Sequence, residues 1–111
     1  MNIFVDFDET ICPDYTAKTE PLENAVETIN ALYEAGNTIK IWSCRTGPAG
    51  EGWQGKTVLQ HIDIMRAYLD RWGVKYHDFV FNKPNCDVFI DDRSHNPKEV
   101  GWEAIGKKLL E

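Results

Sequence analysis

The chain alternates short apolar runs with longer segments in which apolar side chains recur every three or four residues. The short runs are rich in β-branched and aromatic residues and predict strands over residues 2–7, 38–43, 79–81 and 87–91. The recurring pattern predicts helices over residues 21–36, 57–72 and 102–109. Strands that alternate with helices predict an α/β fold with a small parallel sheet.

Residues that favour helix ends set the limits of these helices. Pro21 suits a first helical turn, and Gly36 suits the position that follows a last turn. In the second helix the apolar positions fall on one stripe and are expected to face the core: Leu59, Ile62, Met65, Leu69 and Trp72.

Two stretches without such periodicity predict loops at residues 9–20 and 47–55. The first loop contains Tyr15 and Lys18, for which the sequence indicates no decisive role. The second is rich in glycine and contains Trp53. We expect either a loop that closes over a site and stacks Trp53 on a substrate, or a plain flexible connection.

Composition narrows the class of protein. With 111 residues, 42% of them apolar and 27% charged, the chain fits one globular domain over residues 1–111 rather than a disordered or fibrous protein. A net charge of −6 disfavours nonspecific nucleic-acid binding unless basic groups cluster locally. No apolar run is long enough to span a bilayer, and no signal peptide is expected at the start. The odd count of three cysteines suits a reducing cytoplasm.

Polar side chains suited to phosphate chemistry stand near the ends of the predicted strands: Asp6, Asp8, Ser43, Arg45, Lys83, Asp91 and Asp92. Because parallel strands end at the same edge of a sheet, we expect these side chains to share one site. Carboxylates held close together bind a hard cation such as Mg²⁺. One carboxylate can attack phosphorus and a second can transfer the proton, while hydroxyl and cationic groups hold the phosphoryl group. The set therefore predicts phosphoryl transfer.

Four segments resemble, in order and spacing, the motifs of the haloacid-dehalogenase-like hydrolases: residues 6–10, Ser43, Lys83 and residues 90–92. The resemblance spans residues 3–92. Within it, residues 72–93 are similar to small bacterial and phage members, some linked to capsular polysaccharide synthesis, and to the phosphatase half of phage polynucleotide kinases. Neither interval between the motifs can hold a cap domain. The resemblance therefore implies a capless, Rossmann-like three-layer sandwich with an open site.

The same resemblance implies roles for the carboxylates. Asp6 is the expected nucleophile and a metal ligand, and Asp8 is the expected general acid and base, with its main-chain carbonyl on Mg²⁺. Asp91 and Asp92 are the expected further metal ligands, and the sequence does not decide which of them binds the cation directly. The implied activity is Mg²⁺-dependent hydrolysis of a phosphomonoester through an aspartyl-phosphate on Asp6.

The phosphoryl group is expected to lie against Ser43, Cys44, Arg45 and Lys83. The resemblance implies that Ser43 holds it and that Lys83 balances its charge and orients Asp6. Arg45 is expected either to grip the substrate or to form a surface ion pair. Cys44 is expected to be a packing residue like the other cysteines. The three histidines are expected at the surface or behind the site, not as metal ligands.

Two other functions stay open at this point. Residues 50–57 match the phosphate-loop pattern of nucleotide-binding kinases and ATPases, in which ATP binding would depend on Lys56. A phosphate loop must leave its strand directly, whereas residues 44–49 stand between the strand and this motif. The other alternative is a module that binds metal and phosphate without turnover, and the presence of both Asp6 and Asp8 speaks against it. The substrate itself stays open between sugar phosphates, nucleotides and nucleic-acid ends.

Overall fold

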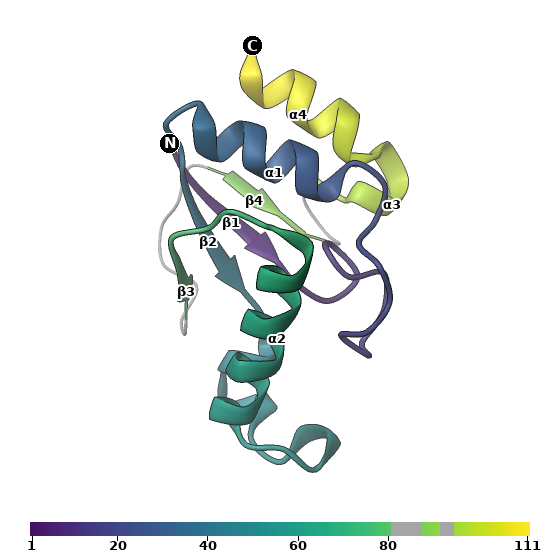
Figure 1. The fold of residues 1–111 in the computed structure, drawn as a ribbon, viewed down its shortest axis with the longest axis vertical. Helices are drawn as coiled ribbons and strands as arrows, with labels where there is room; N and C mark the ends of the chain where they lie inside the picture. The colour runs from purple at the N-terminus through teal and green to yellow at the C-terminus, as the bar shows by residue number, and fades with distance from the viewer. Residues whose placement is uncertain (81–87, 92–94) are drawn as a thin grey trace.

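The computed structural model describes residues 1–80, 88–91 and 95–111 (Figure 1). The strands are β1 Asn2–Asp6, β2 Thr38–Trp42, β3 Asp78–Val80 and β4 Val88–Ile90. The helices are α1 Ala25–Glu34, α2 Val58–Trp72, α3 Pro97–Val100 and α4 Trp102–Leu110. Between β2 and α2 lie the short 3₁₀ turns η1 Cys44–Thr46, η2 Pro48–Gly50 and η3 Trp53–Gly55. The predicted site residues outside the described ranges are Lys83 and Asp92.

The four strands form one parallel sheet in the order β3-β2-β1-β4. β1 lies in the interior of the sheet, with Val5 aligned to Ile41 of β2 on one side and to Ile90 of β4 on the other. The predicted α/β fold with a small parallel sheet is therefore confirmed. Because the strands are parallel, their carboxyl ends lie along one edge of the sheet, where ligand sites of this architecture form (Figure 1).

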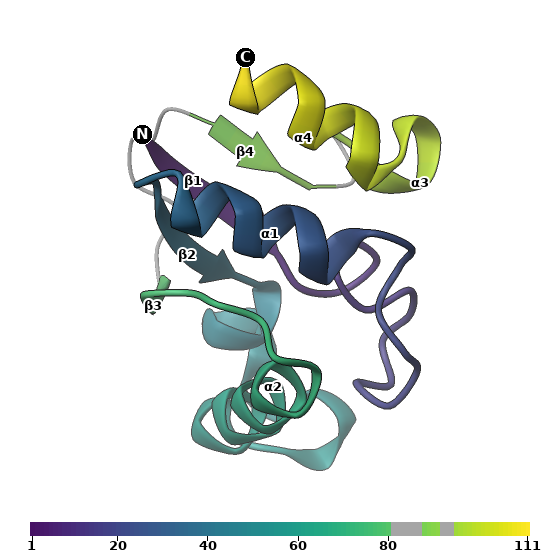
Figure 2. The ribbon, with the colours of Figure 1, turned by 45° about the horizontal axis from the view of Figure 1, so that its top comes forward.

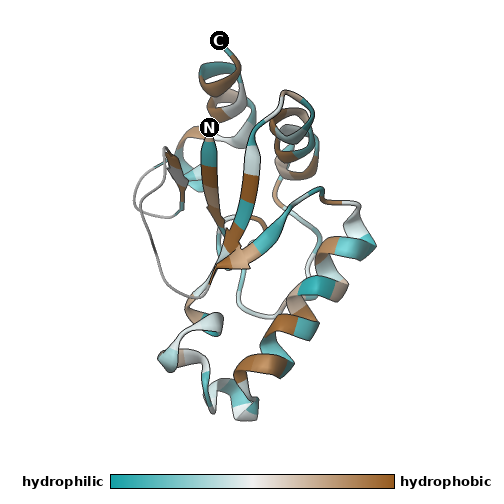
Figure 3. Cartoon of the chain, turned by 90° about the vertical axis from the view of Figure 1, so that its left-hand side faces the viewer, coloured by the Kyte–Doolittle hydropathy of each residue, from teal (hydrophilic) through white to brown (hydrophobic). Residues whose placement is uncertain are grey.

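The hydrophobic core lies against one face of this sheet. Ile3 and Val5 of β1 and their partners Ile39 and Ile41 of β2 are fully buried, because alternate residues of a strand point to the same face. Hydrophobic and hydrophilic bands accordingly alternate along β2 in Figure 3. Helices α1, α2 and α4 contribute to the same buried cluster, and α1 packs beside α4 (Figure 2). The second helical layer of the expected sandwich is not among the described elements.

Helix α1 begins later than Pro21 suggests. Its N-cap residue, Asn24, has a left-handed backbone with a φ of 63°. Before it, the Leu22 N–H donates to the Ile11 carbonyl at 2.9 Å, so this stretch is tied to the first loop instead of continuing the helix. The prediction for the other end is confirmed: Gly36 follows the last turn with a φ of 94°, which glycine adopts without a steric penalty.

Helix α2 begins with a capping box. Thr57 Oγ1 accepts the Gln60 N–H at 3.2 Å, and the Gln60 side chain accepts the Thr57 N–H at 2.8 Å. The prediction that Leu59 faces the core is wrong, because Leu59 lies in the first turn with 73% of its surface exposed. The buried positions of α2 are His61, Ile62, Met65, Tyr68 and Leu69. Two side chains with polar atoms therefore stand on the buried stripe.

The intervals judged too short for a cap domain hold a loop after β1 and, in the described residues after Ser43, short turns, the helix α2 and the strand β3. Residues 7–24 form the loop from β1 to α1, and residues 43–57 form the turns that lead into α2. Both segments therefore leave the sheet at its carboxyl edge, directly after β1 and β2. None of the helices in the described ranges combines the length and the apolar character needed to cross a membrane.

Candidate active site

A buried ion pair joins the residues that follow β1 to the turn that follows β2. Arg45 donates from Nε to Asp8 Oδ2 and from Nη2 to Asp8 Oδ1, both at 2.9 Å. Only 1% of Arg45 and 8% of Asp8 is exposed. The planar guanidinium meets the carboxylate with two hydrogen bonds, which fixes the orientation of both groups. The expectation of an ion pair at the surface is therefore wrong, because Arg45 forms its ion pair in a buried position.

Ser43 connects this ion pair to the end of β2. Its Oγ accepts the Arg45 N–H at 3.1 Å, which caps η1, and donates to Asp8 Oδ2 at 3.3 Å. Thr46 Oγ1 contacts the carbonyls of Ser43 and Val80 at 2.8 and 3.0 Å, so the turn is tied to both β2 and β3. The structure thus brings together three of the predicted site residues: Asp8, Ser43 and Arg45.

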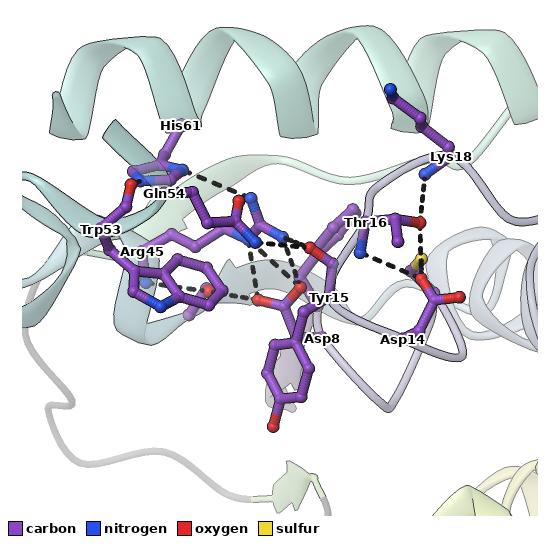
Figure 4. Close-up of polar contacts among 12 residues, drawn as sticks. Asp8, Asp14, Tyr15, Thr16, Lys18, Arg45, Trp53, Gln54 and His61 are labelled. Atoms are coloured by element: carbon purple, nitrogen blue, oxygen red, sulfur yellow. Dashed lines mark hydrogen bonds and ion pairs between the residues drawn. The ribbon is translucent and has the colours of Figure 1, made fainter. Parts of the chain in front are cut away.

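Further groups surround the guanidinium of Arg45 (Figure 4). Its Nη2 donates to the Tyr15 carbonyl at 2.6 Å, and its Nη1 lies 3.3 Å from Nδ1 of His61. The guanidinium carbon lies 4.9 Å from the centre of the Trp53 ring and 5.8 Å from that of Phe7. Each guanidinium nitrogen therefore has a partner in the protein, which offsets the free-energy cost of burying the charge.

His61 is a residue of this site to which the sequence assigns no specific role. It is fully buried, and its Nε2 lies 3.0 Å from the Trp53 carbonyl. Because an arginine N–H can only donate, Nδ1 of His61 accepts, and Nε2 carries the hydrogen that it donates to this carbonyl. His61 thus lies behind the site, one of the two positions expected for it. Its place on the buried stripe of α2 is the signal that could have singled it out.

The glycine-rich loop packs closely against Arg45. A Cβ atom on Gly50 would lie 2.0 Å from the Arg45 carbonyl oxygen, so η2 approaches η1 at a distance that only glycine permits. Further along, Gln54 Nε2 donates to the Tyr15 carbonyl at 3.1 Å, which joins the two loops (Figure 4). These contacts favour a loop that covers Arg45 over a plain flexible connection.

The same segment lacks the backbone arrangement of a phosphate loop. In such a loop, successive N–H groups point at the phosphate. Here the N–H groups of residues 50–52, 55 and 56 donate to backbone carbonyls of the segment itself, at 2.8–3.3 Å. In addition, η1 separates the segment from β2. The geometry therefore gives no support to the nucleotide-binding alternative.

Asp6 and Asp91 stand at the ends of adjacent strands. The residues just before them are aligned across β1 and β4, so the two aspartates follow at the same level of the sheet. Asp6 Oδ1 accepts the Phe7 N–H at 2.7 Å, and Asp91 is buried. Their oxygens are hard donors of the kind that Mg²⁺ prefers. Within the described residues no three His, Cys, Asp or Glu side chains form a metal-binding group, and Asp92 lies outside them, so the metal site stays a prediction.

The two described cysteines have opposite environments. Cys44 opens η1 and is exposed, because the turn directs Arg45 inward and its neighbour outward. The prediction that Cys44 is a packing residue is therefore wrong. Cys12 is buried, as expected, with its Sγ 3.5 Å from Asp14 Oδ1. Burial raises the pKa of the Cys12 thiol.

The loop that carries Tyr15 is held by its own hydrogen bonds. Asp14 accepts from the Thr16 hydroxyl at 2.6 Å, from the Thr16 N–H at 3.0 Å and from the Thr19 hydroxyl at 2.7 Å. These donors, those of Thr16 first, hold the pKa of Asp14 well below its usual range. Tyr68 of α2 donates to the Thr19 carbonyl at 2.6 Å, and burial raises the pKa of Tyr68. The backbone of this loop is therefore fixed on both sides of Tyr15.

A small cavity opens beside the ion pair. It measures about 180 Å³ and is lined by Asp8, Tyr15, Cys44, Arg45, Ala49 and Trp53. A larger hollow of about 750 Å³ lies between the start of α1 and the helices α3 and α4, and its lining includes none of the predicted site residues. The small cavity is the candidate for substrate binding, because it adjoins the polar groups that can take part in chemistry.

No family model and no curated protein matches the chain significantly. Among solved structures, a conserved protein of Bacteroides thetaiotaomicron is similar over 99% of this chain and 89% of its own, with 25% identity and a TM-score of 0.68. A protein of Vibrio cholerae is similar over 97% of this chain and 98% of its own, with 22% identity and a TM-score of 0.61. A D,D-heptose 1,7-bisphosphate phosphatase of Burkholderia thailandensis is similar over 95% of this chain and 73% of its own, with 17% identity and a TM-score of 0.55. The chain therefore has an α/β fold of the haloacid-dehalogenase-like type, which it shares with this phosphatase.

Proposed function

We propose that this chain is a Mg²⁺-dependent phosphomonoester hydrolase of the haloacid-dehalogenase-like superfamily, acting through an aspartyl-phosphate on Asp6. The observation that carries the proposal is the buried cluster of Asp8, Ser43 and Arg45 at the sheet edge where Asp6 ends β1. The cluster offers a carboxylate for proton transfer, and a hydroxyl and a guanidinium for an anion. The fold shared with a heptose bisphosphate phosphatase supports the same class of reaction.

In the proposed reaction, a carboxylate oxygen of Asp6 attacks phosphorus, and the bond between phosphorus and the leaving oxygen breaks. Asp8, released from Arg45 and in its acid form, gives its proton to that oxygen, which departs as an alcohol and leaves Asp8 as a carboxylate. Water then attacks the phosphorus of the aspartyl-phosphate and gives a proton to Asp8, while the bond between phosphorus and Asp6 breaks. Asp6 is regenerated and inorganic phosphate leaves.

Binding of a phosphoryl group to Arg45 would release the Asp8 carboxylate from its hydrogen bonds to the guanidinium. Its guanidinium is hydrogen-bonded to the Asp8 carboxylate, and a guanidinium binds a phosphoryl group with the same fork of donors. An incoming phosphoryl group therefore competes with Asp8 for Arg45. We expect this exchange to free Asp8 for proton transfer to the leaving oxygen, while Ser43 and Arg45 hold the phosphoryl group.

Asp6 and Asp91 would hold the Mg²⁺ ion, with Asp92 as the further ligand that the sequence predicts. The donor set fits this cation, because all three groups are carboxylates and Asp6 and Asp91 follow aligned positions of adjacent strands. When bound, the cation supplies positive charge to the phosphoryl group. Lys83 is expected to add a second positive charge there.

The test of this proposal is phosphate release from an aryl phosphate, sugar phosphates, nucleotides and a 3′-phosphorylated oligonucleotide. The assay compares Mg²⁺ with EDTA, and the wild type with Asp6→Asn. We expect release that needs both Mg²⁺ and Asp6. The matched control is Asp63→Asn, which alters an exposed aspartate on α2. Release that persists in Asp6→Asn would show that Asp6 is not the nucleophile.

The same assay separates the enzyme from a module that binds phosphate without turnover. Such a module would bind Mg²⁺ and a phosphomonoester in its folded state and release no phosphate from any member of the panel. The identity of the best substrate would also test the resemblance to the small bacterial and phage members of the superfamily. A preference for the 3′-phosphorylated oligonucleotide favours the resemblance to the phosphatase half of phage polynucleotide kinases.

A further inference from the structure

We propose that Tyr15 and Trp53 form a subsite for the leaving group, and that this subsite takes a planar aromatic ring, as in a nucleoside monophosphate. The proposal rests on the proposed phosphatase function, because the subsite adjoins the Asp8–Arg45 pair that would handle the phosphoryl group and the proton.

The two rings form a corner beside Asp8. Their centroids are 5.8 Å apart and their planes meet at 85°. Tyr15 is 46% exposed and Trp53 37%, and both line the 180 Å³ cavity. Figure 4 shows the two rings on the same side of the Asp8–Arg45 pair. Such a corner offers a flat ring one surface for stacking and another for an edge contact.

The size of the cavity fits one part of a substrate. Sites that enclose a whole drug-sized ligand measure about 300–1,000 Å³. The cavity beside Asp8, at about 180 Å³, is smaller and suits a single ring system. The phosphoryl group of the same molecule would then lie toward Asp6 and Ser43, outside this corner.

The polar groups of the cavity wall favour an aromatic ring over a sugar. Before a substrate binds, both oxygens of Asp8 accept hydrogen bonds, and Nε, Nη1 and Nη2 of Arg45 each have a partner. In the substrate complex proposed above, Arg45 turns to the phosphoryl group and Asp8 to the leaving oxygen, so neither is left to pair with sugar hydroxyls. The Tyr15 hydroxyl lies at the end of its ring that points away from Asp8 (Figure 4). Sugar hydroxyls that lose water without gaining partners cost free energy. An aromatic ring needs only apolar contact and stacking.

Both aromatic residues are held in place from behind. The Trp53 carbonyl accepts a hydrogen bond from His61 Nε2 at 3.0 Å, and the indole ring of Trp53 lies over the guanidinium of Arg45. The Tyr15 carbonyl accepts from Arg45 Nη2 at 2.6 Å and from Gln54 Nε2 at 3.1 Å. A subsite that is already formed loses less conformational entropy when a ligand binds.

The test uses two substrates that differ by one ring system. Adenosine 5′-monophosphate and ribose 5-phosphate share the same phosphate ester, and only the first carries a base. We expect Trp53→Leu and Tyr15→Leu each to lower the ratio of their kcat/KM values about tenfold. Trp53→Phe, which keeps an aromatic ring, should restore most of the ratio. Tyr33→Leu is the control, because this aromatic residue stacks on His77 and is not in the cavity lining.

A second readout does not depend on turnover. Binding of the same two ligands to Asp6→Asn in the presence of Mg²⁺ is measured by calorimetry, with and without Trp53→Leu. The subsite is supported if the nucleotide binds more tightly than ribose 5-phosphate and if Trp53→Leu removes this difference. This outcome supports the subsite even if no variant releases phosphate and the proposed function fails. The subsite is overturned if both leucine variants release phosphate with an unchanged ratio of kcat/KM values and if the two ligands bind equally well. That outcome leaves the proposed phosphatase function intact.

Discussion

His61 Nδ1 lies 3.3 Å from Nη1 of Arg45, while the other ring nitrogen, Nε2, lies 3.0 Å from the Trp53 carbonyl. One buried imidazole therefore connects the guanidinium that holds Asp8 to the glycine-rich loop that carries Trp53. Because His61 contacts Arg45 and not the proposed position of the phosphoryl group, we expect it to act as a positioning residue for Arg45.

Replacing His61 is expected to impair phosphate binding by the folded protein. His61→Ala leaves a buried Arg45 N–H and the Trp53 carbonyl without their partner, which costs about 1–3 kcal/mol of stability. Because the guanidinium then loses its orientation, KM for a phosphomonoester should rise about tenfold. His61→Gln, which can both accept and donate, should recover part of the KM. The measurement is steady-state kinetics alongside urea unfolding.

Met65→Ala is the matched control for this experiment, because Met65 is fully buried on the same helix and belongs to the hydrophobic core. It should lower the free energy of unfolding without changing KM. An equal rise of KM in both variants would mean that His61 acts only through the stability of α2.

The positions of Asp8, Ser43 and Arg45 could be inferred from the sequence because strand periodicity fixes where a buried strand ends. Parallel pairing then brings those ends to one edge, as the observed strand order confirms. The hydrogen bonds within the site could not be inferred in this way. Arg45 is 37 residues from Asp8 in the sequence, and their pairing depends on how η1 turns, which periodicity does not encode.

The buried residues of α2 likewise could not all be predicted from the hydrophobic spacing. Spacing alone assigned Leu59 to the core, whereas the observed stripe includes His61 and Tyr68. Both have polar atoms, and both meet partners from other segments: His61 meets Arg45, and Tyr68 meets the Thr19 carbonyl. A hydrophobicity pattern undervalues such positions because their burial depends on partners that are distant in sequence.

Asp8→Asn is expected to slow substrates with poor leaving groups more than substrates with good ones. An alkyl alcohol needs the proton that Asp8 would supply, so its release should fall about 10²–10⁴-fold, whereas an aryl phosphate should lose much less. Comparing kcat for glycerol phosphate and an aryl phosphate tests this. Equal losses would argue against an acid role for Asp8.

The Asp8→Asn variant also needs a check of its fold. It leaves the charge of Arg45 buried without its carboxylate, and breaking a buried pair in this way costs about 3–5 kcal/mol. Urea unfolding should show this loss. Ser43→Ala, which removes a hydroxyl contact to Asp8 without changing any charge, should cost less stability and serves as the comparison.

Gly50→Ala is expected to push the glycine-rich loop away from Arg45. The added Cβ would lie 2.0 Å from the Arg45 carbonyl oxygen, so the backbone must shift, at a cost of about 1–3 kcal/mol. The shift should make the loop more open to limited proteolysis. Gly47→Ala is the control, because its Cβ would lie 3.8 Å from the Cys44 carbonyl oxygen in ordinary contact. Equal protease sensitivity in the two variants would contradict the close packing of η2 on η1.

The loop that carries Tyr15 should make a pH-dependent contribution to stability through Asp14. Hydrogen bonds from Thr16 and Thr19 lower the pKa of this carboxyl in the folded state, so folding favours its ionised form. A lowered pKa stabilises the fold above the ordinary aspartate pKa of about 3.9, and the benefit disappears as pH falls below that value toward the folded-state pKa. The effect should be modest, because Asp14 is accessible to water.

Comparing urea unfolding of the wild type and Asp14→Asn from pH 7 to pH 3 tests this sign. The wild type should be the more stable protein at pH 7, and the difference should shrink below about pH 4, because the unfolded chain then takes up a proton on Asp14 that the folded protein does not. Asp63→Asn, on the exposed face of α2, shows how much of any trend belongs to the whole chain. A difference that grows toward acid pH would mean that the Thr16 and Thr19 donors do not favour the ionised carboxylate, and the loop would then owe its order to Tyr68 instead.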